Sequence, residues 1–158
     1  MYICRAEERH IPGMICLLKQ VGQVHHVGRP DIFRAGAQKY NEEDLKMLLQ
    51  DQSRPIFIAE EDGAVLGYGF CILKQTENDP VLRDSRSLYI DDLCVDENCR
   101  GKHVGSQIYA YIKDYARTIG CDTITLNVWA FNESALRFYE AMGMQMRNIH
   151  MEDKLEEN

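Results

Sequence analysis

The sequence lacks long apolar runs and lacks an excess of positive charge. No stretch approaches the roughly eighteen apolar residues that a membrane-spanning helix needs. The chain's 18 lysines and arginines are outnumbered by 25 aspartates and glutamates, which gives a net charge of -7. A general binder of nucleic acid or of anionic membranes would need the opposite balance, whereas neutral and cationic ligands suit this one. We therefore expect neither nucleic acid nor membrane among its partners.

The first residues lack the apolar stretch of a secretory signal. Arg5, Glu7, Glu8 and Arg9 occupy positions where such a signal would carry apolar side chains. Together with the absence of a membrane span, this charged start predicts that the protein works in the cytoplasm.

The cysteine spacing of a metal or redox motif is also absent. Six cysteines form no Cys-x-x-Cys pair and stand mostly inside apolar runs, so we interpret them as reduced thiols of the core. They are Cys4, Cys16, Cys71, Cys94, Cys99 and Cys121. A reactive thiol at Cys94 or Cys99 is the alternative. The adjacent His25 and His26 have no further ligand near them in the sequence, so we expect no metal site.

Internal repeats and low-complexity linkers are absent too, and we predict a single domain over residues 1–158. Apolar spacing predicts helices over 7–21, 41–50 and 104–119 and between Asn132 and Gly143. It predicts strands over 2–5, 56–60, 64–73 and 122–128, a central strand from Leu88, and a last strand over 144–154 whose alternation slips near Asn148. This order of elements predicts an α+β protein with a mixed sheet and helices on both faces.

The turn after the central strand carries the first functional signal. Two glycines and two cations lie around the start of the predicted helix, in the stretch Arg100-Gly101-Lys102-His103-Val104-Gly105-Ser106. The first N–H groups of a helix have no partner within it and attract anions, and glycine lets the backbone approach a ligand closely. The turn therefore indicates a pyrophosphate site, with a plain connection as the alternative. It matches neither the P-loop nor the three-glycine dinucleotide pattern.

A second motif follows later in the chain. It runs Asn132-Glu133-Ser134-Ala135-Leu136-Arg137-Phe138-Tyr139-Glu140-Ala141-Met142-Gly143-Met144. Together the two motifs resemble the GNAT superfamily of acyl-CoA-dependent N-acetyltransferases, whose turn reads Arg/Gln-x-x-Gly-x-Gly/Ala and whose helix reads Asn-x-x-Ala-x-x-Phe-Tyr-x-x-x-Gly-Phe. The resemblance spans residues 56–151 and departs from the pattern at His103 and Met144, where the family usually has glycine and an aromatic residue. It implies a GNAT-like, mostly antiparallel central sheet and transfer of an acetyl group from acetyl-CoA to a primary amine.

The resemblance also implies where acetyl-CoA would bind. Backbone groups of the central strand would pair with the pantetheine arm and offer an N–H to the thioester oxygen at Leu93, Cys94 and Val95. The turn would hold the pyrophosphate through Arg100, Gly101, Lys102, His103, Val104, Gly105 and Ser106. Asn132 would contact the cofactor near the pantetheine, and Tyr139 would be the general acid for the departing thiolate.

Two adjacent carboxylates are candidates for the general base. An amine like that of lysine has a pKa of about 10.4, so holding it neutral at pH 7 costs about 4.6 kcal/mol, and a carboxylate can take its proton directly or through water. Asp91 and Asp92 precede Leu93, and strict alternation puts them on opposite faces unless a bulge intervenes. We keep both candidates and favour Asp91, because polyamine-acetylating relatives have an acidic residue at the matching position. The alternative is that the two aspartates have only a structural role, as capping or paired residues at the edge of a strand.

The acceptor itself is less defined by the sequence. In GNAT relatives the segment that corresponds to residues 23–39 lines the acceptor pocket, which implies that His26 and Phe33, with Asp91, help to choose the substrate. A packed surface loop is the alternative. The acidic net charge favours a small cationic amine, and a homodimer is a possible assembly. A CoA-binding module without turnover and a nucleotide-binding or interaction domain are the competing functions.

Overall fold

The structure is a computed structural model that describes residues 1–156. These residues fall into two compact units, one of residues 1–127 and one that begins at Val128. The first unit contains β1 (Tyr2–Arg5), α1 (Ile11–Gly28), α2 (Glu42–Leu49), β2 (Ile56–Glu61), β3 (Ala64–Thr76), β4 (Ser85–Val95), α3 (Val104–Thr118) and β5 (Thr123–Thr125). Two 3-10 turns, η1 (Glu8–His10) and η2 (Glu97–Cys99), lie between them, and α4 (Glu133–Ala141) belongs to the second unit.

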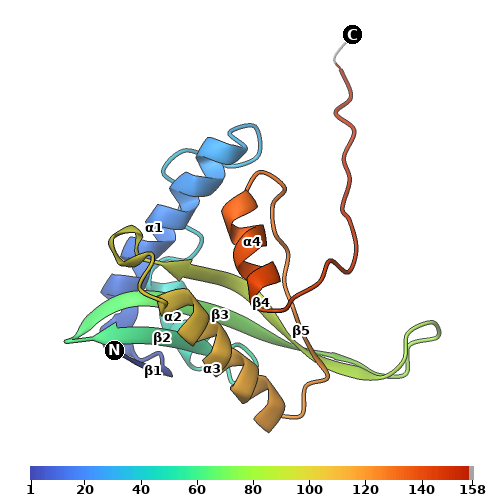
Figure 1. Ribbon diagram of the computed structural model, residues 1–158, viewed down its shortest axis with the longest axis horizontal. Helices are drawn as coiled ribbons and strands as arrows, with labels where there is room; N and C mark the ends of the chain where they lie inside the picture. Colours follow the sequence, from blue (N-terminus) through green and yellow to red (C-terminus); the bar gives the residue numbers. More distant parts are fainter. Residues whose placement is uncertain (157–158) are drawn as a thin grey trace. The chain divides into compact units, whose positions relative to one another are not determined.

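Five strands form one open sheet in the order β1-β2-β3-β4-β5 (Figure 1). The first three pairings are antiparallel, and β5 joins β4 in parallel. The mixed, mostly antiparallel sheet of an α+β fold, predicted from the sequence, is therefore confirmed.

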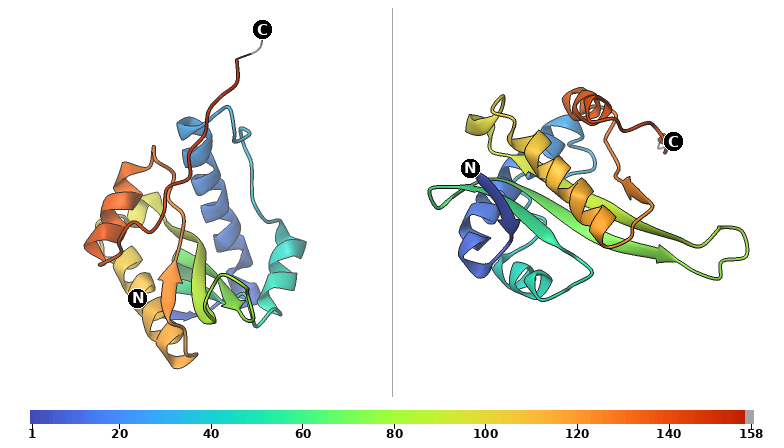
Figure 2. Two further views of the ribbon diagram at one scale, coloured as in Figure 1. Left: turned by 90° about the vertical axis from the view of Figure 1, so that its right-hand side faces the viewer. Right: turned by 60° about the horizontal axis from the view of Figure 1, so that its bottom comes forward.

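Helices cover both faces of this sheet (Figure 2). On one face Tyr68 and Phe70 of β3 pack into a core with Leu17 of α1 and Leu45 of α2. On the other face α3 lies so close that a Cβ atom at Gly69 would stand 2.6 Å from Cδ1 of Ile112. Glycine at this position is what lets α3 approach β3, and the helix thereby reaches the sheet directly above the middle of β3 and β4.

Several expected boundaries differ from the structure. Helix α1 continues through Gly22 to Gly28, so His25 and His26 are helical. The helix ends where Gly28 and Pro30 stand close together. Strand β5 has only three residues, because it finds a partner on β4 over that length alone. The expected last strand is wrong for the described chain: residues 144–156 form neither helix nor strand. A strand needs a neighbour for its backbone hydrogen bonds, and the described sheet ends at β5.

Within residues 1–156, every helix falls short of the length and apolarity required to cross a bilayer.

A buried hydrogen-bond network anchors the start of α1 to β2. The Nε2 atom of His10 lies 2.8 Å from one carboxylate oxygen of Glu60, and the guanidinium of Arg9 donates to the other at 2.8 Å. The Nδ1 atom of His10 is 2.9 Å from the backbone nitrogen of Glu7, so that N–H donates to the ring. His10 and Glu60 are 1% and 4% exposed. The hydrogen bonds from Arg9 and then His10 lower the pKa of Glu60 from 4.5 to about 2.

We predict that Glu60→Gln lowers the free energy of unfolding at neutral pH, because the amide no longer pairs with the Arg9 cation. A carboxyl group with a depressed pKa stabilises the fold above its unfolded pKa and loses that effect as pH falls through its folded pKa. The difference between wild type and variant should therefore shrink as pH falls from about 4.5 toward about 2. Urea titrations at several pH values measure it.

Glu61→Gln is the matched control, since the Glu61 side chain is 54% exposed and pairs with the exposed start of the chain, the N-terminal ammonium. An effect at Glu60 no larger than at Glu61 would show that the network contributes nothing specific.

Candidate functional site

The candidate site begins where β4 and β5 separate. Strand β4 pairs with β3 along Ser85–Val95 but meets β5 only from Ser87 to Tyr89. From Ile90 to Val95 the second edge of β4 has no neighbouring strand among residues 1–156. The Nδ2 atom of Asn127 donates to the Tyr89 hydroxyl at 3.0 Å, which ties the two segments together where they part. The backbone of Leu93, Cys94 and Val95 therefore lies on a strand edge that an extended ligand can join.

The turn that follows β4 is built from two left-handed residues. Gly101 has φ 79°, and His103 has φ 60° with ψ 20°, immediately before α3 begins at Val104. His103 thus adopts the conformation that glycine takes easily, at the position where the family pattern has glycine. Its side chain makes no cap hydrogen bond to the helix, so the first N–H groups of α3 face outward without that acceptor.

Packing and hydrogen bonds hold this turn in place. Val104 is buried beneath it, and its Cγ1 atom would lie 3.2 Å from a Cβ atom at Gly67 of β3. The hydroxyl of Ser106 donates to the carbonyl of His103 at 3.0 Å. The exposed cations Arg100 and Lys102 stand on the same turn. A helix start with nearby cations, fixed at the end of an open strand edge, suits a phosphorylated ligand that also has an extended arm.

A β-bulge places Asp91 and Asp92 on the same side of the sheet. Phe70 pairs with Asp92 but Cys71 pairs with Ile90, so Asp91 is the extra residue of β4. Both carboxylates reach aromatic residues on the face covered by α1 and α2. The expected placement on opposite faces by strict alternation is therefore wrong, because the bulge interrupts the period of two.

Asp91 is held by a cation and a phenol. Its Oδ2 atom accepts from Nζ of Lys39 at 2.8 Å and from the hydroxyl of Tyr40 at 3.0 Å. Partial burial opposes the charge on Lys39, but the hydrogen bond and charge of Asp91 outweigh it and raise the pKa of Lys39. The ring of Tyr40 stacks on Phe70 at 5.6 Å. Asp91 thus already binds one ammonium group.

Asp92 has a different environment. The hydroxyl of Tyr68, a fully buried residue, donates to its Oδ2 atom at 2.6 Å. Burial raises the pKa of Asp92 to about 6, although the Tyr68 hydrogen bond and the charge of Lys39 act in the opposite direction. Burial, with the nearby charge of Asp92, also raises the pKa of Tyr68 well above its ordinary value. A carboxyl group with a pKa near 6 can exchange a proton close to neutral pH.

Cys94 is a core residue. Its thiol is buried and lies 3.7 Å from the carbonyl oxygen of Leu17, and burial raises the pKa of the thiol to about 12. A thiol with so high a pKa supplies little thiolate, which argues against the alternative of a reactive Cys94.

The end of α1 packs against the segment that follows it. The Nδ1 atom of His26 is 2.8 Å from the carbonyl oxygen of Phe33, and the ring of His25 stacks on that of Phe33 at 4.8 Å. Burial, and then the charge of Lys39, lowers the pKa of His25. Lys39 therefore links this segment electrostatically to Asp91. The expectation that His26 and Phe33 line an acceptor pocket stays a prediction.

The second unit contains the other two predicted site residues. Asn132 caps α4, where its Oδ1 atom accepts from the backbone N–H of Ala135 at 3.2 Å. Tyr139 lies in α4 with its ring edge-on to Phe138 at 5.1 Å. The predicted cap and helix are confirmed, while the roles of Asn132 and Tyr139 toward a cofactor stay predictions.

The sequence analysis missed the polar partners of the two aspartates. Lys39 and Tyr40 come from the segment before α2, and Tyr68 comes from β3. A signal was present for Tyr68, because a tyrosine between Gly67 and Gly69 in an apolar strand needs a buried partner for its hydroxyl. Nothing in the sequence indicates that Lys39 would reach Asp91.

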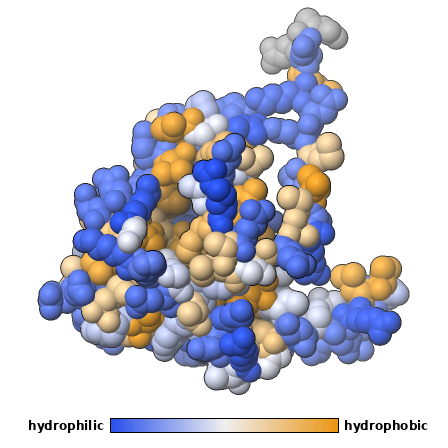
Figure 3. Space-filling model, viewed as in Figure 1, coloured by the Kyte–Doolittle hydropathy of each residue, from blue (hydrophilic) through white to orange (hydrophobic). Residues whose placement is uncertain are grey.

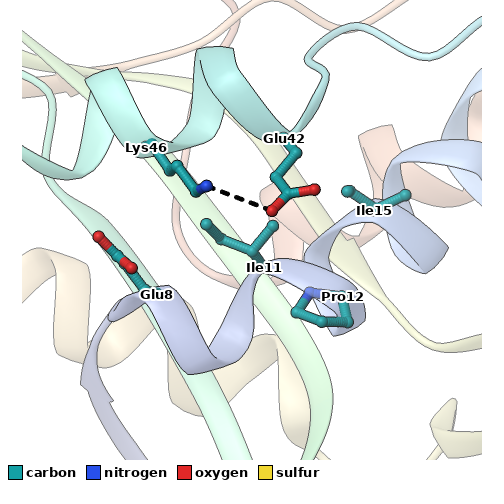
Figure 4. A pocket seen from close by; sticks show the side chains of 6 residues that line it. All are labelled: Glu8, Ile11, Pro12, Ile15, Glu42 and Lys46. Atoms are coloured by element: carbon teal, nitrogen blue, oxygen red, sulfur yellow. Dashed lines mark ion pairs between the residues drawn. The ribbon is translucent and has the colours of Figure 1, made fainter.

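A pocket elsewhere does not contain any of the predicted site residues (Figure 4). It has a volume of about 480 Å³ and is lined by Glu8, Ile11, Pro12, Ile15, Glu42 and Lys46. Its charged residues are engaged with each other, since Nζ of Lys46 lies 3.4 Å from Glu42. The pocket therefore adds no chemistry to the site at β4.

Comparison with known proteins agrees with this geometry. The sequence model of the acetyltransferase (GNAT) family matches residues 11–144. A glucosamine 6-phosphate N-acetyltransferase from Arabidopsis thaliana is 32% identical over 40% of this chain and 40% of that protein. A thialysine N-epsilon-acetyltransferase from Bos taurus is 33% identical over 38% of this chain and 35% of that protein. The chain thus spans less than half the length of these curated relatives.

Solved structures match over almost the whole chain. A mutant of the BH1408 protein from Bacillus halodurans is 30% identical with a TM-score of 0.94, over 98% of this chain and 99% of that one. An aminoglycoside N-acetyltransferase solved in complex with CoA has a TM-score of 0.71 at 17% identity, over 98% of this chain and 100% of that one. At that identity the second likeness concerns the fold alone.

We predict that His103→Gly raises the free energy of unfolding by up to about 1 kcal/mol, because glycine adopts the left-handed conformation without steric cost and this gain exceeds its added freedom in the unfolded chain. Lys102→Gly is the matched control. Its φ is not positive, so glycine there should lower stability slightly. Thermal and urea unfolding of both variants measure the difference. Equal losses in the two variants would show that His103 bears no backbone strain.

Proposed function

The chain belongs to the acetyltransferase (GNAT) family, and on that premise we propose that it transfers the acetyl group of acetyl-CoA to a primary amine by direct attack. The observation that carries the proposal is the open edge of β4 from Ile90 to Val95, which leads directly to the turn before α3. We also propose that residues 1–158 work as one N-acetyltransferase domain, because the family match runs through both compact units.

The cofactor proposal rests on two complementary features of the first unit. The open edge at Leu93, Cys94 and Val95 suits the amide-rich pantetheine arm, since backbone groups of a strand edge can pair with amides. The turn from Arg100 to Ser106 suits the pyrophosphate, with outward N–H groups and two cations. When bound there, acetyl-CoA supplies the activated acetyl group. In the second unit Asn132 is the proposed contact near the pantetheine.

Asp92 is the proposed proton acceptor, although the sequence alone favoured Asp91. Asp91 is already paired with the ammonium group of Lys39 at 2.8 Å. Asp92 has only the phenol of Tyr68 as an acidic partner, and burial raises its pKa to about 6. It is therefore basic at neutral pH and able to accept the proton that the amine loses, directly or through water.

Tyr139 is the proposed general acid. As the amine nitrogen bonds to the thioester carbon, the carbon–sulfur bond breaks and the sulfur needs a proton. A phenol with a pKa of about 10 can protonate a thiolate whose conjugate acid has a pKa of about 8.5. The support for Tyr139 in particular is its place in the family's helix pattern after Phe138.

The proposed acceptor is a small cationic amine. The net charge of -7 attracts cations, and Asp91 already binds the ammonium group of Lys39, which an acceptor ammonium could replace. Relatives named for glucosamine 6-phosphate and for thialysine show that acceptor charge varies among similar proteins. The carboxylate pair favours the thialysine type for this chain.

We predict that acetyl-CoA and CoA raise the stability of the protein, by about 2.7 kcal/mol at a hundredfold excess over the dissociation constant. Thermal shift and calorimetry measure the effect. Gly105→Trp should abolish it in a folded protein, because an indole at the helix start blocks the pyrophosphate. Stabilisation by ATP but not by CoA would contradict the proposal, whereas CoA binding without acetyl transfer to any of a panel of amines would indicate a binding module.

We predict that Asp92→Asn lowers kcat by about 100-fold to 1,000-fold, because asparagine still accepts the Tyr68 hydrogen bond but takes no proton. Wild-type kcat/KM should decline below about pH 6, where Asp92 becomes protonated, and this decline should vanish in the variant. Initial rates from pH 5 to 9 measure both effects. Asp91→Asn is the control and should raise KM for a diamine while keeping the decline near pH 6. If the decline of kcat/KM below about pH 6 vanished in Asp91→Asn and persisted in Asp92→Asn, the two proposed roles would be reversed.

A further inference from the structure

A lysine of this chain already stands where a cation would bind beside the aspartates of β4. Lys39 lies on the segment of residues 29–41, which joins α1 to α2 and contains neither helix nor strand (Figure 2). Its Nζ atom donates to Oδ2 of Asp91 at 2.8 Å and lies 5.6 Å from the centroid of the Tyr40 ring. The Tyr40 hydroxyl donates to the same oxygen at 3.0 Å. A carboxylate and an aromatic ring thus form a site for an ammonium group, which we call the cation position.

The charge of Lys39 also acts on the proposed proton acceptor. Burial raises the pKa of Asp92 to about 6, while the Tyr68 hydroxyl and the charge of Lys39 lower it and the charge of Asp91 raises it. The other titratable and charged groups around Lys39 and the two aspartates come from α1, β3, β4 and the segments that flank α2, and they are His25, Tyr40, Arg54 and Cys94. Lys39 is therefore a cation that contributes to both carboxylates at once.

Without Lys39, Asp91 would bind any cation that reached the site. Hydrophilic side chains cover most of the face shown in Figure 3, and 25 acidic residues outnumber 18 basic ones in the chain. An acidic surface of this kind concentrates cations near it. A monoamine that bound at Asp91 would be held in its charged form, because a carboxylate favours the charged form of its partner. It would occupy the site without being able to attack a thioester.

We propose that Lys39 determines acceptor specificity by filling the cation position until the second ammonium group of a diamine replaces it. This role rests on the proposed acetyl transfer and narrows its acceptors to small diamines. A monoamine gains nothing when it exchanges one ammonium group for another at Asp91. A diamine that makes the same exchange also brings its other amine toward Asp92, which lies on the same side of the sheet. Lys39 thus excludes nonproductive binding without touching the reacting atoms.

Steady-state kinetics with diaminobutane and butylamine, two amines of equal carbon length, test this role. Lys39→Met should lower KM for diaminobutane about tenfold, because no internal ammonium group competes for Asp91. With butylamine the variant should show a lower kcat and a lower KM by the same factor. Nonproductive binding leaves kcat/KM unchanged, since this ratio compares the free species with the transition state.

Two further variants control for the loss of a lysine. Lys39→Arg keeps the positive charge and should behave like wild type toward both amines. Lys46→Met removes a lysine that also pairs with a carboxylate, Glu42 at 3.4 Å, but on α2. It should leave KM for both amines unchanged.

Two measurements without turnover separate this role from acetyl transfer itself. Calorimetry should show that diaminobutane binds about tenfold more tightly to Lys39→Met than to wild type. NMR of the carboxyl carbons should show that Asp92 titrates at a higher pH in this variant, since the charge of Lys39 lowers the pKa of Asp92. Lys39→Gln, which keeps an N–H donor for Asp91 without the charge, replaces Lys39→Met if the latter does not fold.

The outcomes distinguish the two proposals. Tighter binding of diaminobutane to Lys39→Met, with no acetylated product from any amine, would reject the transferase but support the exchange at Asp91. Unchanged KM and affinity for diaminobutane in the variant would overturn the role of Lys39 even in an active enzyme. A higher KM in Lys39→Met would overturn it as well, because it would mean that Lys39 helps to bind the acceptor instead of competing with it.

Discussion

The early separation of β4 from β5 is the constraint on which the rest of the site depends. A strand inside a sheet uses its backbone groups on both sides. In the described part of the chain, β4 keeps one side open from Ile90 to Val95 because its pairing with β5 ends after three residues. The hydrogen bond from Asn127 to Tyr89 fixes the point of separation. The features that the first unit contributes to the candidate site lie along this open stretch or soon after it: the bulge at Asp91, the candidate backbone contacts at Leu93 to Val95, and the turn that starts α3.

Burial then gives two neighbouring carboxylates different properties. The bulge turns both toward the same aromatic cluster, in which the rings of Tyr40 and Tyr68 each pack on Phe70. The Tyr40 hydroxyl donates to Asp91, and the Tyr68 hydroxyl donates to Asp92. Asp91 meets Lys39 and becomes half of an ion pair, whereas Asp92 meets a neutral phenol and has its pKa raised to about 6. A difference of one residue in position thus separates a group suited to binding a cation from a group suited to exchanging a proton.

Much of this arrangement was predictable from the sequence, and there are physical reasons why the remaining features were not. The apolar stripe of α3, the helix start at Val104 and the cap at Asn132 follow from local patterns, and the structure has all three. The bulge was not predictable, because it depends on how β3 and β4 align, and the left-handed backbone of His103 was not, because histidine gives no signal for it. Lys39 and Tyr40 reach Asp91 across 52 and 51 positions of the chain, and no local pattern encodes such a contact. Residues 144–154 have the alternation of a strand, but an alternating pattern does not determine whether a partner strand is available, and the described residues there form no strand.

Hydrogen–deuterium exchange with and without CoA tests the central claim most directly. If CoA pairs with the open edge of β4 and its pyrophosphate rests on the start of α3, exchange should slow at residues 93–95 and 101–106. The β3–β4 hairpin tip, residues 77–84, should exchange at the same rate in both states. Protection confined to the pocket between α1 and α2, or no protection along β4 at saturating CoA, would contradict the account.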